Sequence, residues 1–326
     1  MRRLQNILLV LENNGEQEFA LQRAVSLAVA NQARLTVIDV LPDVSHEMRR
    51  LMGRRRSGDL QQALVRGRCR DLEKMVAEAA ADLPCTVNVL QGTAFVEIIR
   101  QVLRQEHDMV IKTVQRQSVL RRMLFGSADM HLLRKCPCPV LLVKPREEEH
   151  YRRILAAVDI EPTADDEQMA DLNRQILEMA SSVAFAEFCE LHIVHAWQVA
   201  GKKLLNTLHF KAQKEEIRGW IRQQESQLKK RHHEFEKQVQ ALLGERGKEF
   251  LQLTVHMVEG YADQVIPRLA EDVAADLVVM GTVARTGLPG ILMGNTAESI
   301  LGQLDCSVLA VKPHGFQTPV TLANDA

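Results

Sequence analysis

Short, continuous runs of apolar residues alternate with longer stretches of mixed character along the whole chain. In the second half of the chain these runs are Ile154–Val158, Leu191–Ala196, Leu251–Val258, Leu277–Met280 and Val308–Val311. Runs of this length between helical stretches are typical of a parallel sheet that helices cover on both faces. The pattern therefore predicts a doubly wound α/β fold, in which ligands bind beyond the carboxyl ends of the strands.

This pattern occurs twice, because the chain is a tandem duplication. His107–Pro145 aligns without a gap with Ala275–Pro313, and the alignment pairs Gly126 with Gly294. The two openings, NILLVLE and RILAAVD, are also alike. We therefore expect two tandem doubly wound domains, each a five-stranded parallel sheet with helices on both faces. Their expected bounds are residues 1–146 for the first domain, 151–314 for the second domain and 315–326 for a C-terminal tail.

The second half also carries a long insert between its second and third apolar runs. Within Phe210–Phe250, apolar residues such as Ile217, Ile221, Leu228 and Phe235 recur at helical spacing among many charged residues. This spacing predicts a long amphipathic helix with a solvated outer face.

The composition excludes several classes of function. A formal net charge of -1 and an aromatic content of 4% argue against a nucleic-acid-binding protein. No apolar run reaches the ~18 residues of a membrane span, and the N-terminus resembles a first strand rather than a signal peptide. The six cysteines are scattered along the chain, which fits a reducing compartment. We therefore expect a cytoplasmic protein.

Cysteine and histidine side chains form only weak metal-binding patterns. Cys136 and Cys138 make up C-P-C, one residue short of C-x-x-C, and His131 lies five residues before them. A metal site stays open as an alternative, but buried structural thiols are the simpler interpretation. His192 and His195 lie on or near one strand, and residues three apart on a strand point to opposite faces of the sheet. We therefore expect no metal site.

A glycine-rich stretch, GTVARTGLPGILMGNT, begins at Gly281, directly after the apolar run ADLVVM. A loop that leaves a strand tip exposes N–H groups, and the start of the next helix near Gly294 adds more. Glycines let a phosphate approach without a Cβ in the way, while Asn295 or Thr296 can cap the helix and Arg285 can add charge. The spacing alone leaves two alternatives open: a phosphate site, or glycines that only form turns.

The same stretch resembles the glycine motif of the universal stress protein family. ATP-binding members of that family carry G-x-x-G, nine residues, and then G followed by Ser or Thr. Here Gly281-Thr-Val-Ala284 is followed by nine residues and then by Gly294-Asn295-Thr296. The resemblance covers the whole chain twice, as in tandem-domain members. It implies a nucleotide-binding α/β fold with ATP as the ligand.

The resemblance also implies roles for individual residues. Asp159, which ends the first strand of the second half, is expected to meet the adenine or ribose, where it can help to hold Mg²⁺. The main chain of Ala196 is expected to meet the adenine. The residues expected around the phosphates are Gly281, Thr282, Ala284, Arg285, Gly294, Asn295 and Thr296. Ala284 replaces the second glycine of the motif, which costs about 1 kcal/mol or more if φ is positive there. Asn295 replaces the usual Ser or Thr, but it can still donate a hydrogen bond.

The equivalent stretch of the first half has lost most of its glycines. The residues that replace Gly281, Ala284, Gly287 and Gly290 are Thr113, Arg116, Val119 and Arg122. Glu12 stands where the second half has Asp159, and only Gly126-Ser127 keeps the motif. The simpler interpretation is a degenerate copy that is kept for packing. The alternative is a site for a different anion, formed by Lys112, Arg116, Arg121 and Arg122.

The last strand of each half is a candidate contact between the two domains. In single-domain relatives two chains dimerise through these strands, which implies that Val140–Lys144 and Val308–Lys312 pair within this chain. Such pairing makes the protein an intramolecular pseudo-dimer. Association of two such chains into a further homodimer stays open.

Our first hypothesis is a cytoplasmic stress-response protein that binds ATP or a related adenine nucleotide in its second domain and acts on unknown protein partners. A rival hypothesis is a scaffold or carrier without nucleotide, which binds a lipid or metabolite in the cleft between the halves. A slow ATPase is a third hypothesis, although the sequence carries no catalytic motif that supports it, so we expect no catalytic residues.

Overall fold

The computed structural model describes residues 4–12, 17–44, 51, 54–80, 83–114, 125–145, 150–160, 166–198, 211–282 and 293–322. The first half contains β1 (Asn6–Val10), α1 (Glu18–Asn31), β2 (Arg34–Leu41), α3 (Arg54–Ala79), β3 (Cys85–Gln91), α4 (Ala94–Gln105), β4 (Met109–Thr113), α5 (Ser127–Lys135) and β5 (Val140–Val143). The second half contains β6 (Arg153–Ala157), α6 (Asp166–Glu187), β7 (Glu190–Trp197), α8 (Lys211–Phe250), β8 (Leu253–Glu259), α9 (Ala262–Asp272), β9 (Leu277–Gly281), α10 (Asn295–Leu301) and β10 (Ser307–Val311).

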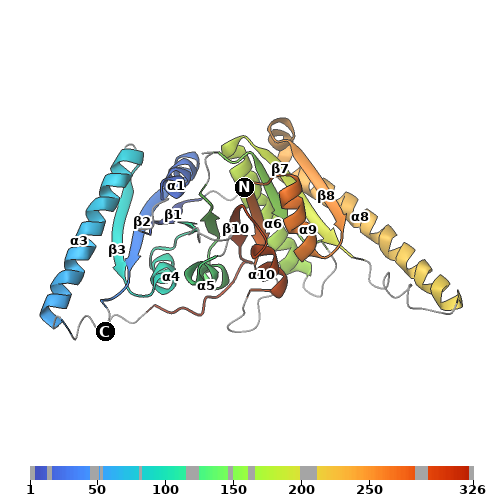
Figure 1. The fold of residues 1–326 in the computed structure, drawn as a ribbon. Helices are drawn as coiled ribbons and strands as arrows, with labels where there is room; N and C mark the ends of the chain where they lie inside the picture. The colour runs from blue at the N-terminus through green and yellow to red at the C-terminus, as the bar shows by residue number, and fades with distance from the viewer. Residues whose placement is uncertain are drawn as a thin grey trace.

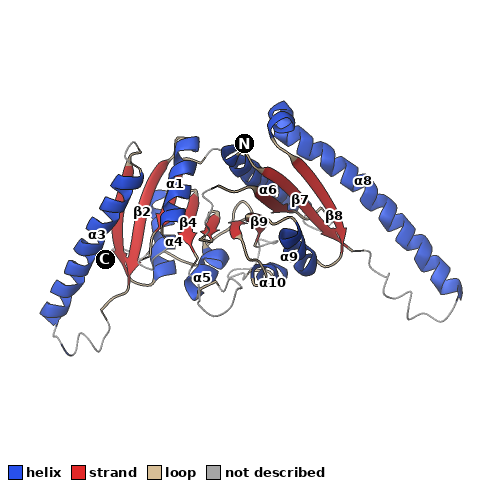
Figure 2. Cartoon of the chain, turned by 45° about the horizontal axis from the view of Figure 1, so that its top comes forward, coloured by secondary structure: helices blue, strands red, loops and turns tan. Residues whose placement is uncertain are grey.

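All ten of these strands form one continuous sheet, in the order β3-β2-β1-β4-β5-β10-β9-β6-β7-β8 (Figures 1 and 2). Within each half the neighbouring strands are parallel, as the sequence predicted. The halves meet where β5 pairs with β10 in the antiparallel direction, with Leu142 opposite Val308 and Val140 opposite Ala310. The pairing of the two last strands is therefore present within the chain, and the strands of the two halves run in opposite directions.

The apolar runs are continuous because both faces of the sheet are buried. On β1, for example, Ile7 and Leu9 pack into one core cluster while Leu8 and Val10 pack into the other. Helices α1, α3, α6 and α8 contribute to the first cluster, and α4, α5, α9 and α10 to the second. Alternate side chains of a strand point to opposite faces, so a strand covered on both sides needs apolar residues at every position.

The predicted helix within Phe210–Phe250 is interrupted near its end. Gly244 has φ 62° and ψ -169°, which is not a helical conformation, so α8 consists of two helical segments that meet there. Residues with a side chain rarely adopt such a positive φ, and glycine does so at little cost. Within the described residues, no helix is long and apolar enough to cross a membrane.

Polar contacts join the two halves on both faces of the sheet. On one face Arg23 of α1 forms an ion pair with the buried carboxylate of Glu187 of α6, and the ring of Tyr151 lies 3.8 Å from the Arg23 guanidinium. On the other face Arg134 of α5 lies 2.6 Å from Glu298 of α10. The C-terminal segment after β10 continues beneath the first half (Figure 1), where Arg100 donates a hydrogen bond to the carbonyl of Thr321.

Candidate functional site

A cavity of about 280 Å³ lies in the second half, at the carboxyl ends of β6, β7 and β9. Apolar side chains form most of its wall, including Ala157, Ile266, Met280 and Ile300. Of the residues predicted from the sequence, the cavity is lined by Asp159, Ala196, Gly281, Thr282, Gly294 and Thr296. A largely apolar cavity with a few polar groups at its rim is typical of a small-molecule site.

Among the described residues, one predicted residue, Asn295, does not line this cavity. Asn295 is the first residue of α10 and its side chain is exposed. Ala284 and Arg285 lie outside the described residues. The effect of a methyl group at position 284 therefore stays a sequence-based expectation.

Asp159 is held at the rim of the cavity through its main chain. Its N–H donates to Oδ1 of Asn173 at 3.0 Å, and Nδ2 of Asn173 donates back to the Asp159 carbonyl at 2.5 Å. The Asp159 side chain is 51% exposed, and its carboxylate lies 3.9 Å from the buried ring of His195. These contacts fix the backbone while the carboxylate faces solvent. Asn173 was not among the predicted site residues; its signal in the sequence is an amide on the otherwise apolar face of α6.

The two glycines that line the cavity differ in their surroundings. A Cβ at Gly281 would lie 2.9 Å from Cδ2 of Leu172, so the Leu172 side chain would have to shift if a larger residue stood there. At Gly294 a Cβ would meet no described residue within 4 Å, and φ is an ordinary -62°. The described residues therefore do not demand glycine at position 294, and they leave space beside it.

The start of α10 differs from the expected capping. Gly294 is the N-cap residue and makes no side-chain cap hydrogen bond, while Asn295 and Thr296 are the first two helical residues. The prediction that Asn295 or Thr296 caps this helix is therefore wrong. Glycine is an acceptable N-cap, and it leaves the N–H groups of the first turn uncovered by a capping side chain.

The hydroxyl of Thr282 is bound to groups outside the cavity. Its Oγ1 accepts a hydrogen bond from the ammonium of Lys312 at 2.6 Å and donates to the carbonyl of Leu133 in the first half at 3.3 Å. The carbonyl of Thr282 accepts the N–H of Gly294 at 3.2 Å, so the two described ends of the glycine loop are joined. Lys312 is only 4% exposed. Burial lowers the pKa of Lys312 to about 7, although the charge of the nearby Cys136 acts to raise it.

A profile of the universal stress protein family matches residues 3–144 and, a second time, residues 150–312. The chain belongs to the universal stress protein family. It is 30% identical over 333 residues to universal stress protein E of Salmonella typhi, covering 100% of this chain and 99% of that protein. It is also 30% identical over 336 residues to universal stress protein E of Escherichia coli K12, covering 100% of this chain and 99% of that protein.

Solved structures support the same family and fold. The protein PA1789 of Pseudomonas aeruginosa PAO1 has a TM-score of 0.69 and 27% sequence identity, covering 95% of this chain and 93% of that chain. A putative universal stress protein of Pseudomonas aeruginosa UCBPP-PA14 has a TM-score of 0.68 and 26% identity, covering 95% and 94%. The tandem arrangement therefore extends over nearly the full length of both proteins.

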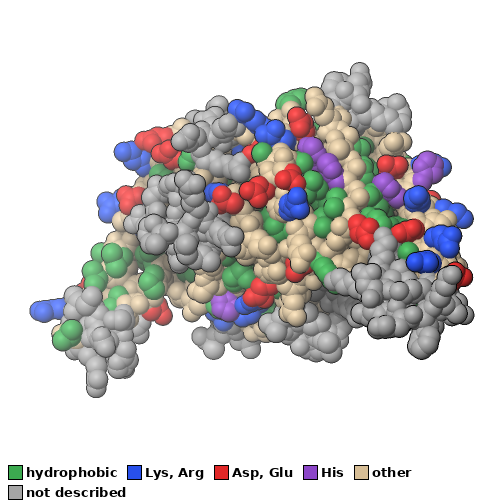
Figure 3. Space-filling view, turned by 45° about the vertical axis from the view of Figure 1, so that its right-hand side comes forward, with side chains coloured by type: hydrophobic (Ala, Val, Ile, Leu, Met, Phe, Trp, Pro, Cys, Tyr) green, Lys and Arg blue, Asp and Glu red, His purple; other side chains and the backbone are tan. Residues whose placement is uncertain are grey.

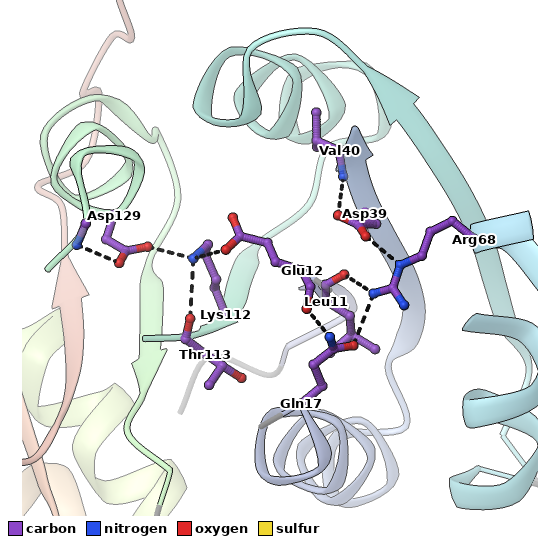
Figure 4. Close-up of polar contacts among 10 residues, drawn as sticks. Leu11, Glu12, Gln17, Asp39, Val40, Arg68, Lys112, Thr113 and Asp129 are labelled. Carbon is purple, nitrogen blue, oxygen red and sulfur yellow. Dashed lines mark hydrogen bonds and ion pairs between the residues drawn. The ribbon is translucent and has the colours of Figure 1, made fainter. Parts of the chain in front are cut away.

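In the first universal stress protein domain a buried ion cluster takes the place of the cavity wall (Figure 4). Nζ of Lys112 lies 2.8 Å from Asp129 and 3.0 Å from Glu12. The repeat aligns Lys112 with Met280 and Asp129 with Ala297, both of which line the cavity of the second domain.

Burial would lower the pKa of Lys112, but the two carboxylates outweigh it and raise the pKa. The charge of Lys112 is thus already neutralised, which weakens the alternative of an anion site here; Arg116, Arg121 and Arg122 lie outside the described residues.

A second buried ion pair lies beside this cluster, on the other face of the sheet (Figure 4). Nε of Arg68, from α3, lies 2.6 Å from Oδ2 of Asp39, and the guanidinium also donates to the carbonyl of Leu11 at 2.8 Å. Asp39 is at the strand position that His195 occupies in the second domain, as the registers of β1–β2 and β6–β7 show. Charged side chains therefore fill both sides of the strand tips in the first domain.

The histidines of β7 do not converge, as expected. His195 is buried against the main chain of Val158, whereas Nδ1 of His192 lies 3.0 Å from Nε2 of His256 on β8. His256 was not predicted as a neighbour of His192, because neighbours on adjacent strands are not visible in sequence spacing. Among the described residues no group of three potential ligands can hold a metal ion.

Basic and acidic side chains intermix over the face shown in Figure 3, in line with the net charge of -1.

Proposed function

We propose that the second domain binds ATP or a related adenine nucleotide, and that the protein acts as a regulator in the stress response. The observation that carries this proposal is the cavity of about 280 Å³, with the Asp159 carboxylate at one end and the open space beside Gly294 at the other. Apolar walls suit a purine base, an exposed carboxylate suits ribose hydroxyl groups, and uncovered N–H groups suit phosphate oxygens.

The proposed roles follow this arrangement. Asp159 accepts hydrogen bonds from the ribose, and the main chain of Ala196 contacts the adenine. Gly281 and Thr282 form the strand end of the phosphate loop, while Gly294, Asn295 and Thr296 supply main-chain and side-chain donors at its helical end. Ala284 and Arg285 are proposed to complete the phosphate site. When Mg²⁺ accompanies ATP, Asp159 is the proposed protein carboxylate beside it.

Titration of the purified full-length protein with a fluorescent ATP analogue tests the proposal. We expect one saturable site per chain. Gly294→Val should weaken binding at least tenfold, because the valine side chain occupies the space beside the N–H groups. The matched control is Gly126→Val, which makes the same change at the equivalent position of the first domain and should leave binding intact. Absence of saturable binding at millimolar nucleotide, or an equal loss in both variants, contradicts the proposal.

The rival carrier hypothesis is supported by a different observation. A second cavity, of about 670 Å³, lies between α6 and α8 and shares Asp159, Met169 and Asn173 with the first. It lies within the second domain rather than between the halves. Mass spectrometry of the native protein after gentle purification distinguishes the hypotheses, since a co-purifying lipid or metabolite without nucleotide favours the carrier.

A slow ATPase is tested separately. Phosphate release that follows nucleotide binding and disappears in Asp159→Ala supports it. Nucleotide bound without phosphate release favours a non-enzymatic regulator.

A further inference from the structure

We propose that Cys136 and Cys138 are a redox-active pair of thiols, which a peroxide oxidises to an intramolecular disulfide, and that this oxidation weakens ligand binding in the second domain. The disulfide itself stands independently of any ligand. Only the effect on binding rests on the proposed nucleotide site.

The two sulfur atoms are already neighbours. Sγ of Cys136 lies 3.6 Å from Sγ of Cys138, and Pro137 between them fixes the backbone at a rigid residue. A disulfide bond of about 2.05 Å requires the sulfurs to approach by roughly 1.5 Å, which side-chain rotation supplies. Cys136 is fully buried, whereas Cys138 keeps 8% exposure.

A buried ammonium group stands beside this pair. Within the described part of the chain, Lys312 contacts the carbonyl of Leu133, the hydroxyl of Thr282 and, at 5.0 Å, the ring of Phe316. None of these groups carries a negative charge. A buried charge without an opposite charge is costly, and a thiolate beside an ammonium is stabilised in turn.

The charge distribution makes Cys136 the reactive thiol. Burial would raise the pKa of Cys136, but the hydrogen bonds of Cys138 and the charge of Lys312 outweigh it and lower the pKa. The hydrogen bond to Cys136, together with burial, raises the pKa of Cys138. Cys136 therefore ionises first, and Cys138 keeps its proton.

The proposed reaction consumes one hydrogen peroxide. The Cys136 thiolate attacks one peroxide oxygen, the O–O bond breaks, and the sulfur is oxidised to a sulfenic acid while the other oxygen leaves as hydroxide and takes up a proton. The Cys138 sulfur then attacks the Cys136 sulfur, the S–S bond forms, and the sulfenic hydroxyl leaves with the Cys138 proton as water. Two thiols and one peroxide thus yield one disulfide and two water molecules.

This pair belongs to the first domain alone. The repeat places Cys306 opposite Cys138, but Leu304 stands where the first domain has Cys136. Both thiols lie where α5 ends and β5 begins, next to the end of β10 that carries Lys312. Once the thiolate is consumed, the Lys312 ammonium loses its favourable charge interaction with Cys136. The deprotonated amine is then favoured, and its hydrogen bond to Thr282 at the glycine loop is weakened.

Oxidation of the full-length protein tests the first part. After treatment with hydrogen peroxide, the remaining thiols are alkylated and the digest is analysed by mass spectrometry. We expect the peptide with Cys136 and Cys138 to lack two hydrogen atoms and to carry no alkyl group, and dithiothreitol to restore alkylation of both. Cys306 should stay alkylated throughout. Alkylation of both Cys136 and Cys138, or their conversion to sulfinic acid, overturns the proposal.

A pair of lysine variants tests the role of the ammonium. Lys312→Met should slow disulfide formation roughly tenfold, because a higher Cys136 pKa leaves less thiolate. Lys144→Met, at the equivalent position of the first domain, should not change the rate, and Lys312→Arg should retain it if the methionine variant fails to fold. Equal rates in Lys312→Met and Lys144→Met contradict the proposal.

Nucleotide titration of reduced and oxidised protein tests the second part. We expect the oxidised form to bind roughly tenfold more weakly, as expected for loss of one charge-assisted hydrogen bond. Thr282→Val should abolish this difference between the two forms, whatever its own affinity. Equal affinities in oxidised and reduced wild type overturn the link. If the reduced protein binds no nucleotide, the proposed function fails and the disulfide result is unaffected.

Discussion

The two domains differ in the side chains that stand at the carboxyl ends of their strands. In the first domain Lys112, Asp129 and Glu12 form a buried cluster. In the second domain Met280 and Ala297 stand at the first two positions and leave a cavity beside Asp159. The same fold can therefore hold an internal ion cluster at its strand tips or line a cavity there. The difference comes from a few side chains and not from the topology, which is shared.

The largest effect should come from breaking the cluster of the first domain. Lys112→Met leaves the buried carboxylate of Asp129 without its cation, which should lower the free energy of unfolding by about 3–5 kcal/mol. Chemical denaturation measures this value. The double variant Lys112→Met/Asp129→Ala copies the second domain and should recover most of the loss. A single-variant cost below about 1 kcal/mol would show that the cluster does not hold this domain together.

A smaller, pH-dependent effect should come from His107, which aligns with Ala275. Burial lowers the pKa of His107 to about 4. The charge of Arg34 lowers this pKa further, whereas a hydrogen bond with the backbone of Asn6 acts to raise it. Between pH 6.5 and 4 the unfolded chain therefore binds a proton that the folded chain does not, so stability falls as the pH drops through this window. The loss should total about 2–3 kcal/mol.

His107→Ala should remove this dependence, whatever its effect on stability at neutral pH. Denaturant titrations at several pH values, compared with wild type, measure the slope. An unchanged slope between pH 6.5 and 4 would refute the role of His107.

The smallest effect should come from copying the first domain at the glycine loop. Gly281→Thr introduces the residue that the first domain has at position 113, and its Cβ would lie 2.9 Å from Leu172. Overpacking of this kind should cost about 1–2 kcal/mol and weaken nucleotide binding. Gly294→Ala is the control, since a Cβ there meets nothing within 4 Å in the described part of the chain, and it should change stability by less than about 0.5 kcal/mol. Equal costs at the two positions would contradict the packing explanation.

Local periodicity was sufficient to predict most of the fold. The apolar runs indicated the strands, and the repeat together with the family resemblance indicated the pairing of Val140–Lys144 with Val308–Lys312, which the antiparallel contact of β5 and β10 confirms. The break of α8 at Gly244 was not predicted, because an isolated glycine in a long helical pattern is usually tolerated.

The side-chain contacts of the site could not be predicted in the same way. Glu12 and Lys112 are far apart in the sequence, and their contact depends on the adjacent placement of β1 and β4. Likewise, the close approach of Gly281 to Leu172 of α6, which gives this glycine a packing role beside its proposed phosphate role, is not visible in the spacing of the motif. Motif spacing identifies the region of a site, but partners from distant strands and helices decide what each side chain contacts.

The antiparallel contact between β5 and β10 makes the two halves of the chain depend on each other. Because β5 and β10 are antiparallel, the carboxyl ends of the strands in one domain lie next to the amino ends of the strands in the other. Leu133 of one domain thus supports Thr282 of the other, and the main-chain N–H of Lys144 donates in return to Ser307. A domain separated from the chain would lose these hydrogen bonds, so each half depends on the other for contacts at the ends of its strands.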